Sequence, residues 1–302
     1  MPIFGLSILG NNSALPAFDR HPTAQVLYLD EQIFLIDCGE GTQMQLAKYK
    51  VRRSRINHVF ISHLHGDHFF GLIGLISSMS LLGRETDLHI YGPGQLEKII
   101  MMQLDATGNH LKFPLHFHAN SAEDIILNEE KYSVSCFTVQ HRVECWGYIF
   151  REKRQPRKIL KESVLKFNIP ATFYKRLQQG EDYTQKNGET ILNEWVTEDN
   201  TPGKSYAYCA DTIYDKTLAT KVKDVHLLYH EATYLHDLEE RAASRFHSTT
   251  KQAACIAKSA FVKRLLIGHF SSKYEELDVF LEEAKTVFEN TDLAIEGVTF
   301  RL

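Results

Sequence analysis

The most constraining feature of this chain is a short segment with three histidines and an aspartate, Ser62-His63-Leu64-His65-Gly66-Asp67-His68. It directly follows an apolar run, and imidazoles and a carboxylate this close together are costly to bury without partners. Because a turn that leaves a strand points alternate side chains to one side, His63 and His65 can share one cation. Asp67 and His68 can then reach a second cation. Mixed nitrogen and oxygen ligands suit Zn²⁺, with Mn²⁺ or Fe²⁺ also possible. The alternative, that these histidines only cap a helix, does not explain their spacing.

The composition predicts an ordinary globular protein. With 302 residues, 43% of them hydrophobic, the chain can form one large domain or two modest ones. Its formal net charge of -4 argues against disorder and against whole-molecule attraction to nucleic acid, so a polyanion site must be local. The five cysteines form no short-spaced pair, which fits a reducing compartment. Because no signal peptide or membrane span is recognisable, we expect a soluble, cytoplasmic protein without membrane contact.

Runs of strand length alternate with patterns of helix length, which predicts a mixed α/β chain. Strands are expected at residues 25–29, 33–36, 58–61, 88–91, 133–139, 146–150, 205–209, 225–229 and 264–267. Helices are expected at residues 43–48, 69–82, 94–103, 249–260 and 275–289.

Several titratable residues come directly after apolar runs of strand length. They are Asp37, His141, Asp211, His230, Glu231 and His269. Because ligands gather beyond the carboxyl ends of strands in open α/β sheets, we expect these side chains to line one site. Taken singly, His141, Asp211 and His269 could equally be hydrogen-bonded residues at strand ends.

Together with the histidine segment, these residues fill two coordination shells. The first would hold His63, His65 and His141, the second Asp67, His68 and His269, and Asp211 would bridge them. Two cations about 3.5 to 4 Å apart clamp the oxygens of a phosphodiester and make hydroxide available near neutral pH. The predicted chemistry is therefore hydrolysis.

These residues resemble the metallo-β-lactamase superfamily and, within it, the short-form ribonuclease Z family of transfer-RNA 3′-processing enzymes. The family is indicated by four further stretches, namely residues 37–43 (DCGEGTQ), 230–233 (HEAT), 247–249 (HST) and 268–272 (GHFSS). The resemblance covers nearly the whole chain. It implies one αββα sandwich domain over residues 1–302, two zinc ions, a homodimer, and endonucleolytic removal of the 3′ trailer from precursor tRNA. A 3′-hydroxyl would remain on the tRNA and a 5′-phosphate on the trailer.

The resemblance also assigns roles to single residues. Asp67 would orient or deprotonate the attacking water, and His247, paired with Glu231, would protonate the departing ribose oxygen, since a carboxylate partner raises the pKa of a histidine. Asp37 would hold a ligand histidine in its tautomer. The plainer alternatives are a helix-start contact for Glu231, a surface position beside a helix cap for His247 and a strand-end turn for Asp37.

Residues 151–203 interrupt the apolar pattern at the place where the family carries a tRNA-binding arm. Nine Lys or Arg and two Glu lie between positions 151 and 176, which is the local charge that phosphate contacts require. We expect this arm to bind tRNA through Arg154, Arg157 and Lys158. A solvated loop with a short helix near residues 161–167 is the alternative.

Two stretches depart from the family pattern. The arm reads Ile169-Pro170-Ala171-Thr172 where Gly-Pro is common after the Ile-Pro step, and an early loop has Phe18 and His21 where the family has Lys and Asn. The alternative activities are hydrolysis of small phosphodiesters or thioesters at the same two metals, and a non-enzymatic RNA-binding scaffold. An open metal site argues against the scaffold, because structural zinc sites are usually closed.

Overall fold

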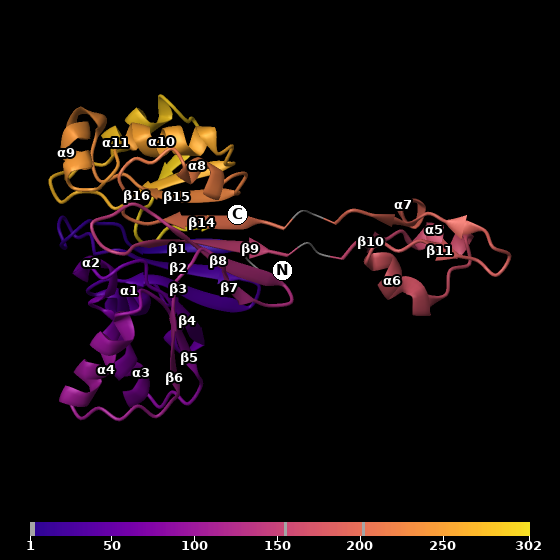
Figure 1. Ribbon diagram of the computed structural model, residues 1–302, viewed down its shortest axis with the longest axis horizontal. Coiled ribbons are helices and arrows are strands. Elements are labelled where there is room, and N and C mark those ends of the chain that lie inside the picture. The colour runs from indigo at the N-terminus through magenta and orange to yellow at the C-terminus, as the bar shows by residue number, and fades with distance from the viewer. Residues whose placement is uncertain (1–3, 154–155, 201–202) are drawn as a thin grey trace. The chain divides into compact units, whose positions relative to one another are not determined.

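The computed structural model describes residues 4–153, 156–200 and 203–302, and its chain divides into two compact units (Figure 1). The main unit consists of Met1–Arg151 and Lys204–Leu302, and the arm unit consists of Glu152–Gly203. In the described part of the chain, no helix combines the length and the apolar character that a bilayer span needs.

The main unit is built around two seven-stranded mixed sheets that face each other. The first sheet contains, in spatial order, β18 (Thr299–Arg301), β1 (Gly5–Gly10), β2 (Ala24–Leu29), β3 (Gln32–Cys38), β4 (Ile56–Phe60), β5 (Leu88–Gly92) and β6 (Leu115–Ala119). The second contains β17 (Thr291–Leu293), β16 (Arg264–Gly268), β15 (Leu227–Glu231), β14 (Ser205–Cys209), β9 (Trp146–Glu152), β8 (Tyr132–Thr138) and β7 (Ile125–Asn128).

Helices cover the outer face of each sheet, which confirms the predicted four-layer αββα sandwich (Figure 1). The first sheet carries α1 (Thr42–Lys48), α2 (Gly66–Phe69), α3 (Leu72–Leu81) and α4 (Leu96–Ala106). The second carries α8 (Leu218–Lys221), α9 (Glu239–Ser244), α10 (Thr250–Ser259) and α11 (Asp278–Lys285). Buried aromatic side chains fill the space between the sheets, among them Phe34, Phe60 and Phe150, whose rings contact one another.

Parallel strand pairs position the site. In the first sheet β3, β4, β5 and β6 run parallel, and in the second β14, β15, β16 and β17 do so. The carboxyl ends of parallel strands meet at one edge of a sheet. The loops that leave these strands therefore bring side chains from distant parts of the sequence together.

The helix predicted at residues 69–82 is divided into α2 and α3 at Gly71. The Gly71 N–H donates to the carbonyl of Cys38 at 2.9 Å, and a Cβ on Gly71 would lie 2.1 Å from the carbonyl oxygen of Gly39. Only glycine allows the two backbone segments to approach so closely. This contact fixes α2, which carries Asp67 and His68, against the end of β3.

The arm unit has a small core of its own. It contains β10 (Lys158–Ile159) paired with β13 (Thr197–Glu198), β11 (Tyr183–Thr184) paired with β12 (Thr190–Ile191), and the helices α5 (Lys161–Lys166), α6 (Tyr174–Gln178) and α7 (Asn193–Val196). The buried side chains are Val164, Ile169, Leu177, Ile191 and Val196. The unit is thus a folded element, with the short helix expected near residues 161–167 as one of its parts.

Candidate metal centre

The seven predicted metal ligands come together at the carboxyl ends of strands from both sheets. His63 and His65 lie in the loop after β4, and Asp67 and His68 in helix α2 that follows it. The second sheet contributes the remaining ligands: His141 between β8 and β9, Asp211 after β14 and His269 after β16.

The first group of ligands consists of His63, His65, His141 and Asp211, whose ligand atoms lie within 4.8 Å of one another. Nδ1 of His65 lies 3.0 Å from Nε2 of His63 and 3.1 Å from Nε2 of His141. Oδ2 of Asp211 is 3.6 Å from Nε2 of His63. These separations are close to those between ligands that share one zinc ion with bonds of roughly 2.0–2.1 Å.

The second group contains Asp67, His68 and His269, again within 4.8 Å. Nε2 of His68 lies 3.2 Å from Nε2 of His269, and Oδ2 of Asp67 lies 3.4 Å from the latter. The other oxygen of Asp211, Oδ1, is 3.2 Å from Nε2 of His269 and 3.5 Å from Nε2 of His68. The two oxygens of this carboxylate therefore face different groups, as a bridging ligand requires.

The chemistry of these side chains fits bound cations. Oδ1 of Asp211 is buried without a hydrogen-bond partner in the described part of the chain, and an unpaired buried carboxylate oxygen is costly. Burial lowers the pKa of His65 to about 4, with a further contribution from His141. Burial also lowers the pKa of His63 and His141, so these imidazoles are neutral and offer lone pairs. The residues thus fit two divalent cations.

Asp37 is the residue that holds His68. It is fully buried at the end of β3, and its Oδ2 lies 2.7 Å from Nδ1 of His68. The same carboxylate accepts hydrogen bonds from the Ser62 N–H at 2.7 Å and the Tyr208 hydroxyl at 2.5 Å. These bonds keep Nε2 of His68 aimed at the second group, as expected of a carboxylate behind a metal-binding histidine.

Replacement of Asp37 by asparagine is expected to weaken metal binding by roughly 10- to 100-fold, because His68 loses its charged partner. Competition with a chromophoric chelator measures this affinity. Tyr208→Phe is the matched control, since it removes one hydrogen bond from the same carboxylate and keeps its charge. Equal affinities for wild type and Asp37→Asn would contradict the assigned role.

Other ligands are held by groups that the sequence did not single out. Nδ1 of His141 donates to the carbonyl of Phe246 at 3.0 Å, and Nδ1 of His269 lies 2.9 Å from the Thr233 hydroxyl. Nδ1 of His63 lies 3.0 Å from the Ser62 hydroxyl. The only feature of the sequence that pointed to Thr233 was its place in the 230–233 stretch.

Glu231 and His247 form the expected pair. Oε1 of Glu231 lies 2.9 Å from Nδ1 of His247, and the carboxylate also accepts from the Thr212, Thr233 and Ser248 N–H groups at 2.9 to 3.1 Å. Burial alone lowers the pKa of His247, but Glu231 outweighs that effect and raises it to about 9. His247 is therefore an imidazolium at neutral pH.

A short helix start positions His247. Thr249 caps α10 by a capping box with Gln252, in which the Thr249 N–H donates to the Gln252 side chain at 3.0 Å. His247 lies two residues before this cap, and its N–H donates to the carbonyl of Ala242 at 2.9 Å. The backbone around His247 is thus fixed from both sides, and the residue is buried rather than at a surface position.

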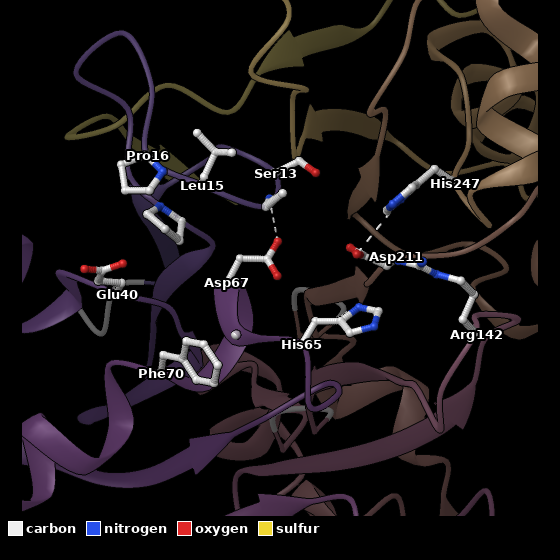
Figure 2. A pocket seen from close by; sticks show the side chains of 13 residues that line it. Ser13, Leu15, Pro16, Glu40, His65, Asp67, Phe70, Arg142, Asp211 and His247 are labelled. Atoms are coloured by element: carbon white, nitrogen blue, oxygen red, sulfur yellow. Dashed lines mark hydrogen bonds and ion pairs between the residues drawn. The ribbon is translucent and has the colours of Figure 1, made fainter.

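A cavity of about 410 Å³ opens onto the two ligand groups (Figure 2). Asp67, Asp211 and His247 come from sequence-distant elements and line it together with Arg142 and Phe70. The early loop forms another wall, and the Ala14 N–H donates to Oδ2 of Asp67 at 2.7 Å. Arg142 and Phe70 were not predicted, because neither belongs to a recognisable pattern of site residues.

Not every predicted residue joins this centre. His230 is buried, its Nδ1 donates to the carbonyl of Glu231 at 2.7 Å, and it belongs to none of the metal-binding groups found among the described residues. It sits within β15, where neighbouring side chains point to opposite faces, so His230 and Glu231 cannot both face the site.

The three predicted tRNA-binding residues of the arm have different outcomes. Arg154 lies outside the described residues. Arg157 forms an ion pair with Asp199 and donates to the Thr197 hydroxyl at 2.7 Å. Lys158 lies 3.7 Å from Glu198. Nine Lys or Arg in residues 152–203 are balanced by eight Asp or Glu, so the arm as a whole is nearly neutral.

Comparison with known proteins finds relatives over the whole length of this chain. A family model described as Anti-Pycsar protein Apyc1 matches residues 4–143. Ribonuclease Z of Bacteroides thetaiotaomicron is 42% identical over 300 residues, which cover 99% of this chain and 95% of that protein. Ribonuclease Z of Porphyromonas gingivalis is 41% identical over 304 residues, which cover 100% of both chains.

Solved structures share the fold. The short form of human tRNase Z (ELAC1) has a TM-score of 0.71 at 24% identity, with 98% of each chain covered. The metallo-beta-lactamase fold protein YhfI from Bacillus subtilis has a TM-score of 0.72 at 19% identity, with 100% of each chain covered.

Proposed function

This chain belongs to the ribonuclease Z family, and from that membership and the geometry of its site we propose that it cuts precursor tRNA at the 3′ trailer. It is an endoribonuclease, that is, a phosphodiester hydrolase. The observation that carries the proposal is the Glu231–His247 pair, in which His247 lines the same cavity as Asp67 and Asp211.

Two zinc ions are the cofactor that we propose, with His63, His65 and His141 holding one, Asp67, His68 and His269 the other, and Asp211 both. Bound there, two such ions supply a hydroxide near neutral pH and neutralise the charge of a phosphodiester.

The protein side chains then have separate roles. Oδ2 of Asp67 faces the cavity and is fixed by the Ala14 N–H, so it orients the attacking water. Burial raises the pKa of Asp67, but His68 and His269 outweigh it and hold that pKa well below its usual range. The carboxylate is therefore ionised and can accept a hydrogen bond from that water.

His247 supplies the proton for the leaving group. As an imidazolium beside Glu231 it donates to the ribose 3′-oxygen, so that the tRNA keeps a 3′-hydroxyl and the trailer a 5′-phosphate. A ribose alkoxide is a poor leaving group, and a substrate of this kind needs such a donor. Esters with good leaving groups have little use for it.

The arm is proposed as a tRNA-binding element. Because Arg157 and Lys158 are ion-paired, the cations best placed for phosphate are Lys161 and Lys166 on α5 and Lys175 on α6. All three are exposed, and within the described part of the chain no ion pair involves them. This assignment extends the predicted use of Arg154, Arg157 and Lys158.

The triple variant Lys161→Ala, Lys166→Ala and Lys175→Ala is expected to raise KM for precursor tRNA at least about tenfold, because phosphate contacts supply much of the affinity. The slope of log affinity against log salt should fall by roughly 2–3. Hydrolysis of bis(p-nitrophenyl) phosphate, followed by absorbance, should be unchanged.

The matched control for the arm is Arg157→Ala with Lys158→Ala. It removes cations that are already neutralised by Asp199 and Glu198, so its effect on KM should be smaller. Equal losses on tRNA and on the small diester in the triple variant would refute an arm that acts by binding.

A homodimer is proposed from an exposed apolar surface on the helices of the first sheet. Leu81 and Leu82 at the end of α3 are 83% and 63% exposed, Phe70 is 64% exposed, and Met102 on α4 is 61% exposed. Apolar surface of this kind marks an interface. Light scattering should give twice the chain mass, and Leu81→Asp should give the mass of one chain.

We also place this activity in the cytoplasm, since the substrate is an RNA and the five cysteines are free.

The deciding experiment is incubation of the zinc-loaded protein with 3′-extended precursor tRNA, with the cut mapped and its end groups analysed. A single cut at the trailer junction, with a 3′-hydroxyl and a 5′-phosphate, is the expected result. Hydrolysis of cyclic nucleotides or thioesters without cleavage of tRNA would instead support a small-molecule hydrolase.

A further inference from the structure

Three histidines form a row across the first sheet, near the amino ends of β5 and β6 and away from the loops that carry the metal centre. The strand register pairs His58 with His89 and His89 with His116. Paired residues on neighbouring parallel strands point to the same face. The imidazole rings stack accordingly, with centroids 5.2 Å apart for His58 and His89 and 4.8 Å apart for His89 and His116.

A carboxylate completes a set of metal ligands at the exposed end of this row. Asp87 directly precedes β5, and its Oδ2 lies 3.3 Å from Nε2 of His116. Asp87, His89 and His116 each offer one ligand atom, and these three atoms lie within 4.8 Å of one another. The ligand atoms in each group of the candidate metal centre are equally close. Two imidazoles and a carboxylate are a typical zinc donor set, with water in the remaining position.

Neighbouring groups hold these ligands in place. Nε2 of His118 lies 3.0 Å from Nδ1 of His89, and this contact orients the His89 ring. Arg84 donates to the backbone carbonyls of Asp87 at 2.6 Å and Ile56 at 3.0 Å, so the segment entering β5 is fixed to β4. The three ligands are therefore not carried by an unsupported loop.

The exposure of the set also suits a cation. The side chains of His116 and Asp87 are 44% and 54% exposed, which leaves the site open to ions from solvent.

We propose that Asp87, His89 and His116 bind a further divalent transition-metal ion, zinc or a cation of similar preference, at the edge of the first sheet. The ion links β5 to β6, which is the edge strand of that sheet. It is separate from the hydrolytic centre and adds to the side-chain contacts that already join the two strands at this end. Its role is stabilisation of an exposed sheet edge.

The test is zinc content and thermal stability of wild type, of His89→Ala with His116→Ala, and of the control His110→Ala, which removes an exposed histidine outside the row. After zinc loading and desalting, elemental analysis should find one zinc per chain fewer in the double variant and no change in the control. The rise in Tm that zinc gives should be smaller in the double variant. Equal zinc content and equal Tm response in all three proteins would overturn the proposal.

A second set of variants, made in a protein that lacks the shared ligand of the candidate metal centre, tests this site independently of the proposed function. In Asp211→Asn, which loses the shared ligand of the candidate metal centre, zinc should still bind at the edge and should disappear when His89 and His116 are also replaced. If the protein with all three replacements bound as much zinc as Asp211→Asn alone, the edge site would be refuted. This outcome does not depend on whether the protein cleaves tRNA. Cleavage of tRNA by His89→Ala with His116→Ala should equal that of wild type.

Discussion

Replacing Asp67 by alanine is expected to lower kcat for precursor tRNA at least about 10⁴-fold, because in the proposed mechanism this one carboxylate both binds metal and orients the attacking water. Its Oδ2 lies 3.4 Å from Nε2 of His269 and accepts from the Ala14 N–H, so its position at the cavity is fixed. Single-turnover cleavage of end-labelled precursor tRNA measures this loss.

The fold should survive this change. Asp67 lies at the cavity rather than in the core, and its neighbours His68 and Gly71 keep their own contacts with β3. Circular dichroism and Tm should therefore stay close to wild type, and Kd for tRNA should change little. A loss of cleavage that merely followed a loss of folded protein would contradict a catalytic role.

Replacing His247 by alanine is expected to lower kcat for precursor tRNA by about 10²–10⁴-fold, the usual contribution of a general acid. Hydrolysis of bis(p-nitrophenyl) phosphate should fall much less, because nitrophenolate leaves without a proton. The ratio of the two losses is the measurement. Equal losses on both substrates would mean that His247 acts on the metal centre instead of on the leaving group.

Glu231→Gln provides the matched test through pH. The proton on His247 is present below its pKa of about 9 and is lost as pH rises through that value. Without the Glu231 charge this pKa falls, so the alkaline limb of kcat/KM should move to lower pH. An unmoved limb would show that another group controls it.

Local patterns in the sequence predicted a mixed α/β chain and the residues of the two ligand groups, whereas the sandwich and the Glu231–His247 pair were predicted from the resemblance to the family. Apolar runs followed by titratable residues locate strand ends, and the carboxyl ends of parallel strands converge. The strands β1, β6, β7, β17 and β18 were not predicted. Some of these are short or lie at sheet edges, where exposure weakens the apolar alternation, and β1 is buried on both faces and has no alternation to detect.

Contacts between distant segments were beyond such patterns. Tyr208 reaches Asp37 from the other sheet, and nothing in the strand 205–209 distinguishes it from Tyr206. In the arm, the basic run 151–176 predicted free positive charge, but Asp199 and Glu198 follow more than twenty residues later and pair with Arg157 and Lys158. Local charge counts miss partners that the fold supplies.

The bridging position of Asp211 has a consequence for how the two halves of the molecule stay in register. Each group of ligands draws side chains from both sheets, since His63, His65, Asp67 and His68 belong to the first half of the chain and Asp211 and His269 to the last third. A slip of one sheet along the other by even one residue spacing would separate the ligands of the first sheet from those of the second in both groups at once. Metal bound at the centre should therefore hold these parts of the chain together. Fragments 1–151 and 204–302 should reassociate far more tightly when zinc is present than after chelation.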